Sequence, residues 1–113
     1  MTTVTPTTPA LQAWREAIAL LHDASDLAYA ERNTHALGLW ADLIGSAARN
    51  LLPSDQGHIL DEIVLPPEVV DRGFAAMVLA AEERTRAHPI EEFPPGASGV
   101  IVELCKLAGQ VSP

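Results

Sequence analysis

The chain has 113 residues, the length of a single domain, and 48% of them are hydrophobic, which predicts a folded core rather than disorder. Seven basic and fifteen acidic residues give a formal net charge of −8, and the basic residues form no run. Because binding to nucleic acid needs basic groups opposite the phosphates, this charge argues against direct nucleic-acid binding.

The composition also indicates the compartment. Cys105 is the only cysteine, so a single chain can form neither a disulfide nor a thiolate metal cluster. Residues 1–9 lack the basic and apolar stretches of a secretory signal, and no apolar run approaches the roughly 20 residues of a membrane span. We therefore expect a cytoplasmic protein with no membrane contact.

The first predicted helix runs from Pro9 to about Glu31. Thr8 provides a hydroxyl for the N-cap, and proline suits the first helical position. Apolar residues then recur every three or four positions, the spacing of one helix face. Residues 1–8, which precede this helix, are expected to form a flexible polar tail, and residues 9–113 a single helical domain.

The second predicted helix follows a break at residues 32–34 and ends near Asn50. Its beginning repeats the first helix, because residues 36–44 carry Ala, Leu, Trp and Ile at the same offsets as residues 10–18. Both tryptophans of the chain, Trp14 and Trp40, lie in this repeat. The short connection between two amphipathic helices predicts an antiparallel hairpin.

The second half of the chain predicts two further main helices, from Pro67 to about Ala87 and from Ser98 to about Gly109, with a short helix at residues 58–63. Residues 91–96 are expected to form an acidic, proline-rich loop. Cys105 has apolar neighbours at helical spacing, so its thiol is expected to be buried. Four main helices with short connections predict an all-α bundle.

The hairpin carries the main functional indication. The first helix is apolar over more than half of its circumference, which is more surface than the other helices of one chain are expected to cover. Surplus apolar surface usually meets another chain. We therefore expect a non-enzymatic protein–protein interaction domain that forms a homodimer through its first two helices. The candidate interface residues are Leu11, Trp14, Ile18, Leu21, Leu37, Trp40 and Ile44.

An acidic face suggests an alternative function. Residues 61–92 hold eight acids and three arginines. Such a surface can imitate phosphates, as in an inhibitor or regulator of a nucleic-acid-binding protein. Apolar core positions interrupt these acids, which favours a simple solvated face. The acidic-face candidates are Asp61, Glu62, Glu68, Asp71, Glu82, Glu83, Glu91 and Glu92.

A small metal-dependent hydrolase is the weakest alternative. His58 with Asp61 and Glu62 is the densest grouping of possible metal ligands. The Glu-x-x-His pairs of di-metal helical bundles do not occur, and neither do the glycine-rich phosphate loop or the nucleophile motif of hydrolases. The sequence therefore predicts no catalytic residue, no metal and no cofactor.

Overall fold

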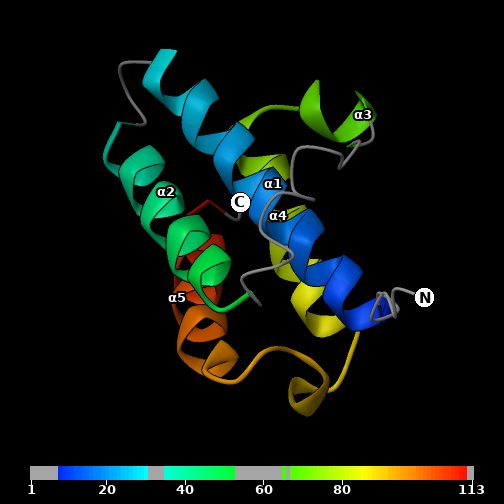
Figure 1. The fold of residues 1–113 in the computed structure, drawn as a ribbon. Helices are drawn as coiled ribbons and strands as arrows, with labels where there is room; N and C mark the ends of the chain where they lie inside the picture. Colours follow the sequence, from blue (N-terminus) through cyan, green and yellow to red (C-terminus); the bar gives the residue numbers. More distant parts are fainter. Residues whose placement is uncertain (1–7, 31–34, 53–64, 66, 112–113) are drawn as a thin grey trace, which may run out of the picture.

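The computed structural model describes residues 8–30, 35–52, 65 and 67–111, and these residues confirm the predicted all-α fold. They form five α-helices and a short 3-10 helix, with no strand among them (Figure 1). The α-helices are α1 (Pro9–Ala30), α2 (His35–Asn50), α3 (Pro67–Val70), α4 (Phe74–Arg86) and α5 (Ala97–Val111), and the 3-10 helix is η3 (Ile90–Glu92).

The four long helices form a closed bundle. α1 packs against α2 on one side and against α4 on the other, and α5 contacts both α2 and α4 (Figure 1). Ala28 meets Gly38 and Leu21 meets Gly45, so α1 and α2 run antiparallel as the predicted hairpin. The start of α1 is capped as the sequence predicts, because the Leu11 N–H donates to Thr8 Oγ1 at 3.1 Å.

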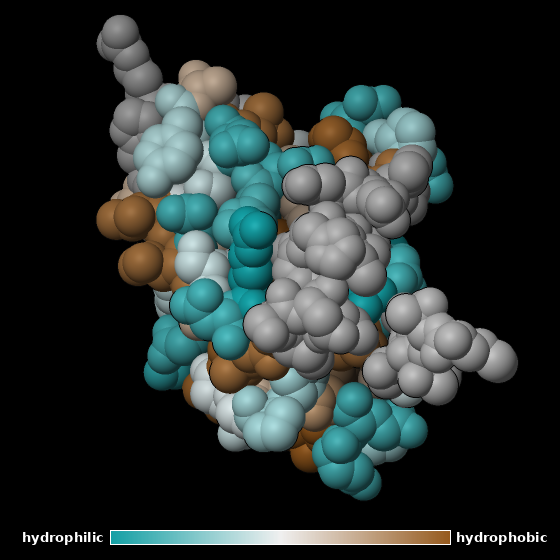
Figure 2. Space-filling model, in the orientation of Figure 1, coloured by the Kyte–Doolittle hydropathy of each residue, from teal (hydrophilic) through white to brown (hydrophobic). Residues whose placement is uncertain are grey.

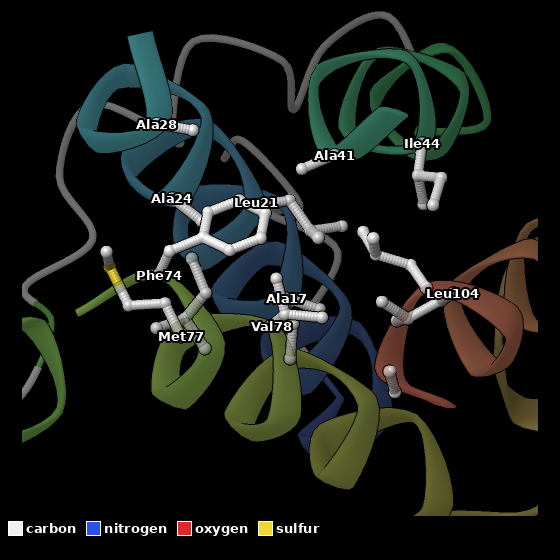
Figure 3. Close-up of a cluster of buried hydrophobic side chains, with 14 residues drawn as sticks. Ala17, Leu21, Ala24, Ala28, Ala41, Ile44, Phe74, Met77, Val78 and Leu104 are labelled. Carbon is white, nitrogen blue, oxygen red and sulfur yellow. The ribbon is translucent and has the colours of Figure 1, made fainter. Parts of the chain in front are cut away.

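The centre of the bundle is filled by small and medium-sized side chains of all four long helices. Figure 3 shows them gathered between the helices. Fully burying one large aliphatic side chain contributes roughly 1.5–3 kcal/mol to folding, so this cluster is the main source of stability. Its labelled members are Ala17, Leu21, Ala24, Ala28, Ala41, Ile44, Phe74, Met77, Val78 and Leu104.

A second cluster surrounds Trp14 near the start of α1. The indole is 1% exposed, and its ring centroid lies 5.3 Å from that of Phe93, in the segment between η3 and α5. Ala48 and Leu52, at the end of α2, pack into the same cluster. This cluster attaches the loop after η3 to the hairpin.

The predicted third helix is wrong in one respect, because the structure divides residues 67–87 into α3 and α4. Gly73 separates them with φ 100° and ψ −170°, a backbone conformation that residues with a Cβ essentially do not adopt. The apolar spacing continues across this glycine, so periodicity alone did not show the break. α5 differs less, since it continues through Gly109 to Val111.

The thiol of Cys105 was predicted to be buried, and this is also wrong: the residue is exposed. Cys105 lies at the edge of α5 that borders α4, where its Sγ is 3.9 Å from Glu82 Oε1. The apolar neighbours along the sequence face the core from adjacent positions of the helix. Residues 1–7 of the predicted tail at residues 1–8, and the predicted helix at residues 58–63, lie outside the described residues.

Candidate interaction surface

The predicted interface residues fall into two groups. Trp14, Ile18, Leu21 and Ile44 are buried within the single chain and offer no surface to a second copy in this conformation. A helical stripe in a sequence does not reveal whether it is covered by its own chain or by another. The other three candidates, Leu11, Leu37 and Trp40, are half-buried.

A row of apolar side chains on α2 stays uncovered after the bundle has packed. Its two largest members, Leu39 and Leu43, are 50% and 60% exposed. Ala36 and Ala47 are exposed at either end of the row, and the spacing of three or four residues places all four on one side of the helix. Figure 2 shows hydrophobic surface at the left edge of the molecule, over α2. We call Ala36, Leu39, Leu43 and Ala47 the α2 stripe.

The α2 stripe carries no charge, although the whole chain has a net charge of −8. Between residues 36 and 50 the charged residues are Asp42 and Arg49. The Asp42 carboxylate is turned toward α1, where its Oδ1 lies 3.5 Å from His22 Nδ1. Arg49 is two positions from Ala47 and so projects from a different side of the helix. An uncharged apolar row on an acidic protein suits contact with another apolar surface.

A groove of about 310 Å³ lies between α2 and α5, beside the α2 stripe. This is the lower end of the size range of pockets that bind small ligands, and it is large enough for an apolar side chain. Leu43 and Ala47 belong to both the groove and the stripe. The groove is lined by Trp40, Leu43, Ile44 and Ala47 from α2 and by Gly99, Val100 and Glu103 from α5.

Glu103 is the charged residue of this lining, and its carboxylate already has partners. The Trp40 indole N–H donates to Glu103 Oε2 at 3.3 Å, which links α2 to α5 at the groove. The Lys106 ammonium lies 3.3 Å from Glu103 Oε1, one helical turn along α5. The carboxylate is therefore satisfied within the chain, and the rest of the lining is apolar.

Among the described residues, nothing gives Gly99 a structural reason to be glycine. It lies in the first turns of α5 without a positive φ, and a Cβ added to it would meet no described atom within 4 Å. Glycine inside a helix costs about 1 kcal/mol relative to alanine. Gly38 differs, because a Cβ there would lie 2.5 Å from the Cβ of Ala28. The missing side chain at Gly99 leaves the α5 side of the groove open.

The described acidic-face candidates are spread over α3, the turn that follows it, α4 and η3. Glu82 is half-buried and its Oε1 lies 2.9 Å from Arg86 Nε, while Glu92 Oε2 lies 3.7 Å from His88 Nδ1. The Arg86 guanidinium weakens the negative potential of Glu82, and the His88 imidazole does the same for Glu92 only when it is protonated. The others that the structure describes are exposed, namely Glu68, Asp71, Glu83 and Glu91, and Asp61 and Glu62 lie outside the described residues. A role in phosphate mimicry stays a prediction.

The described residues contain no group of three His, Cys, Asp or Glu side chains placed to hold a metal ion. His58, with its two acidic neighbours, lies outside them. Partial burial, followed by the negative charge of Glu82, raises the pKa of the Cys105 thiol. An activated cysteine nucleophile needs a lowered pKa, so this environment does not suit covalent catalysis.

Comparison with known proteins finds no family model that matches this sequence, no similar curated protein and no similar solved structure. In the part of the chain that the structure describes, no helix has both the length and the hydrophobicity to cross a membrane.

Proposed function

We propose that this chain is a protein-interaction domain that forms a homodimer through the α2 stripe. The observation that carries the proposal is the exposure of Leu39 and Leu43 on a helix whose other sides are packed against α1 and α5. Contact with a second chain removes this apolar surface from water, which is the main driving force for association.

The arrangement of the stripe favours a second copy as the partner. Read from either end, the stripe has the same order of side chains: alanine, leucine, leucine, alanine. A two-fold axis that pairs α2 antiparallel with its copy therefore places large side chains at the centre and small ones at the ends. This self-complementarity is what an isologous dimer requires.

The net negative charge of the chain limits which surfaces of two copies can be in contact. Two copies with a net charge of −8 repel each other, so a dimer contact has to avoid carboxylates. The α2 stripe meets this condition, because its residues are uncharged and the carboxylate of the nearby Asp42 is turned toward His22 on the α1 side.

The leucines alone give a weak dimer. The four leucines of two stripes, each about half exposed, correspond to roughly two full leucine burials, or about 3–6 kcal/mol. A micromolar dimer needs about 8 kcal/mol, after the cost of lost translational and rotational freedom. Further contact surface beside the stripe is therefore needed.

Sedimentation or light scattering across the micromolar range tests the proposal. We expect a dimer for the natural chain and a monomer for Leu39→Asp and Leu43→Asp. Ile90→Asp is a matched control, because Ile90 is 50% exposed but lies in η3, away from the α2 stripe and outside the groove lining. A natural chain that stays monomeric throughout this range would refute the proposed function.

A further inference from the structure

We infer that the groove between α2 and α5 receives Leu39 of a second copy, so that α5 forms part of the dimer interface. This inference rests on the proposed self-association and identifies the surface that lies opposite the α2 stripe. It accounts for the contact area that the leucines of the stripe do not supply.

The geometry of the two features supports this pairing. The stripe and the groove share Leu43 and Ala47, so they are adjacent on the same face of the molecule. An antiparallel pair of α2 helices can bring Leu39 of one copy opposite Leu43 of the other across a two-fold axis. Because Leu43 forms a wall of the groove, Leu39 of the second copy then lies over that wall. The same rotation places the other Leu39 over the first groove, so both are filled at once.

The chemistry of the groove indicates a neutral aliphatic occupant. The described residues of its lining are apolar apart from Glu103, and that carboxylate is already held by the Trp40 indole N–H and the Lys106 ammonium. A cationic ligand would have to compete with Lys106 for the carboxylate. A leucine side chain does not compete for the carboxylate, and Leu39 of the adjoining α2 stripe is 50% exposed.

Gly99 supplies an independent observation. Neither the backbone conformation nor packing against the described residues calls for glycine at this position. Gly99 lines the groove, and a Cβ added to it would meet no described atom within 4 Å, so the absence of a side chain leaves room on the α5 side of the groove. Glycine therefore keeps the groove open for an incoming side chain.

The first experiment fills the groove. We expect Gly99→Leu to raise the dissociation constant of the dimer about tenfold or more, because the new side chain takes the place of the incoming Leu39. Gly109→Leu is the matched control: it is the same substitution in the same helix, also with no atom within 4 Å of the added Cβ, at a residue outside the groove lining. It should retain the natural dissociation constant, and circular dichroism should show both variants folded.

The second experiment joins the two residues directly. Leu39→Cys and Gly99→Cys, each also carrying Cys105→Ser, are purified separately, mixed and treated with oxidised glutathione. A disulfide needs the two Cα atoms within about 7 Å, so a covalent dimer between positions 39 and 99 should form. Leu39→Cys mixed with Gly109→Cys, which also carries Cys105→Ser, should give little of this product, because Gly109 lies about 15 Å beyond Gly99 along α5.

The outcomes separate this inference from the proposed function. If the natural chain is a dimer that Leu39→Asp dissociates, while Gly99→Leu binds as tightly as Gly109→Leu, the groove is not the contact and the inference is overturned. The proposed function would then stand. A monomeric natural chain would overturn both. If Gly99→Leu fails to fold, the cross-link between positions 39 and 99 decides: its formation supports the inference, and its absence in a proven dimer overturns it.

Discussion

The indole N–H of Trp14 donates a hydrogen bond of 3.0 Å to the carbonyl oxygen of Ala48, which joins the start of α1 to the end of α2. Ala48 lies in the last turn of α2, where carbonyls lack the usual partner four residues ahead within the helix. The Leu51 N–H also bonds this oxygen, at 3.2 Å. Trp14 thus closes the open end of the hairpin as well as filling the second core cluster.

Replacing Trp14 should therefore unfold the chain rather than only dissociate a dimer. Trp14→Ala should lower the free energy of unfolding by about 3–5 kcal/mol, because it removes a buried ring and leaves a cavity. Trp14→Phe should lose less, about 1–3 kcal/mol, mainly through the missing hydrogen bond. Urea denaturation measures both. Loss of the dimer with an unchanged urea midpoint would show instead that Trp14 serves an interface.

Even the smallest side chain at position 38 should lower the stability of the fold. A Cβ there would lie 2.5 Å from the Cβ of Ala28, so Gly38→Ala forces α1 and α2 apart. Overpacking of this kind costs about 1–3 kcal/mol. Thermal unfolding should show a lower midpoint for Gly38→Ala. Gly109→Ala, at a helical position with open space around its Cβ, should raise the midpoint slightly.

Replacing Gly73 tests how far the backbone break between α3 and α4 depends on glycine. No atom of the described residues lies within 4 Å of an added Cβ, so Gly73→Ala measures the cost of φ 100° without a steric clash from them. We expect a loss of about 1–3 kcal/mol in the free energy of unfolding, again by urea denaturation. A neutral result would mean that the two helices can join into the continuous helix that the apolar spacing suggests.

Cys105 should react slowly with alkylating reagents. Its pKa is raised, first by partial burial and then by Glu82, so less of the reactive thiolate is present near neutral pH than for a free cysteine. Glu82→Gln removes the repelling charge and should lower this pKa, which increases the rate of reaction with iodoacetamide at pH 7.5. As the pH rises through the pKa of the natural thiol, the two rates should converge.

Glu83→Gln is the control for this measurement. It removes the same charge from the next position of α4, which projects from another side of the helix and is exposed. Its alkylation rate should match that of the natural chain. Equal rates for Glu82→Gln and Glu83→Gln would show that Glu82 does not act on the thiol.

Local sequence patterns by themselves determined the helices at the start of the chain. The capping hydroxyl of Thr8, the proline after it and the regular apolar spacing place α1 within one residue of its predicted end. These interactions join residues three or four positions apart, so they can be predicted without knowledge of the fold. The antiparallel hairpin follows because the connection to α2 is short.

Tertiary structure decided which apolar residues are covered. Trp14 and Leu43 both belong to apolar stretches of helices, yet one is buried and the other is 60% exposed. The difference depends on where α4, α5 and the loop at Phe93 pack, and these contacts join residues far apart in the chain. The groove between α2 and α5 arises in the same way, because Trp40 of α2 and Gly99 of α5 line one groove only when the two helices pack together.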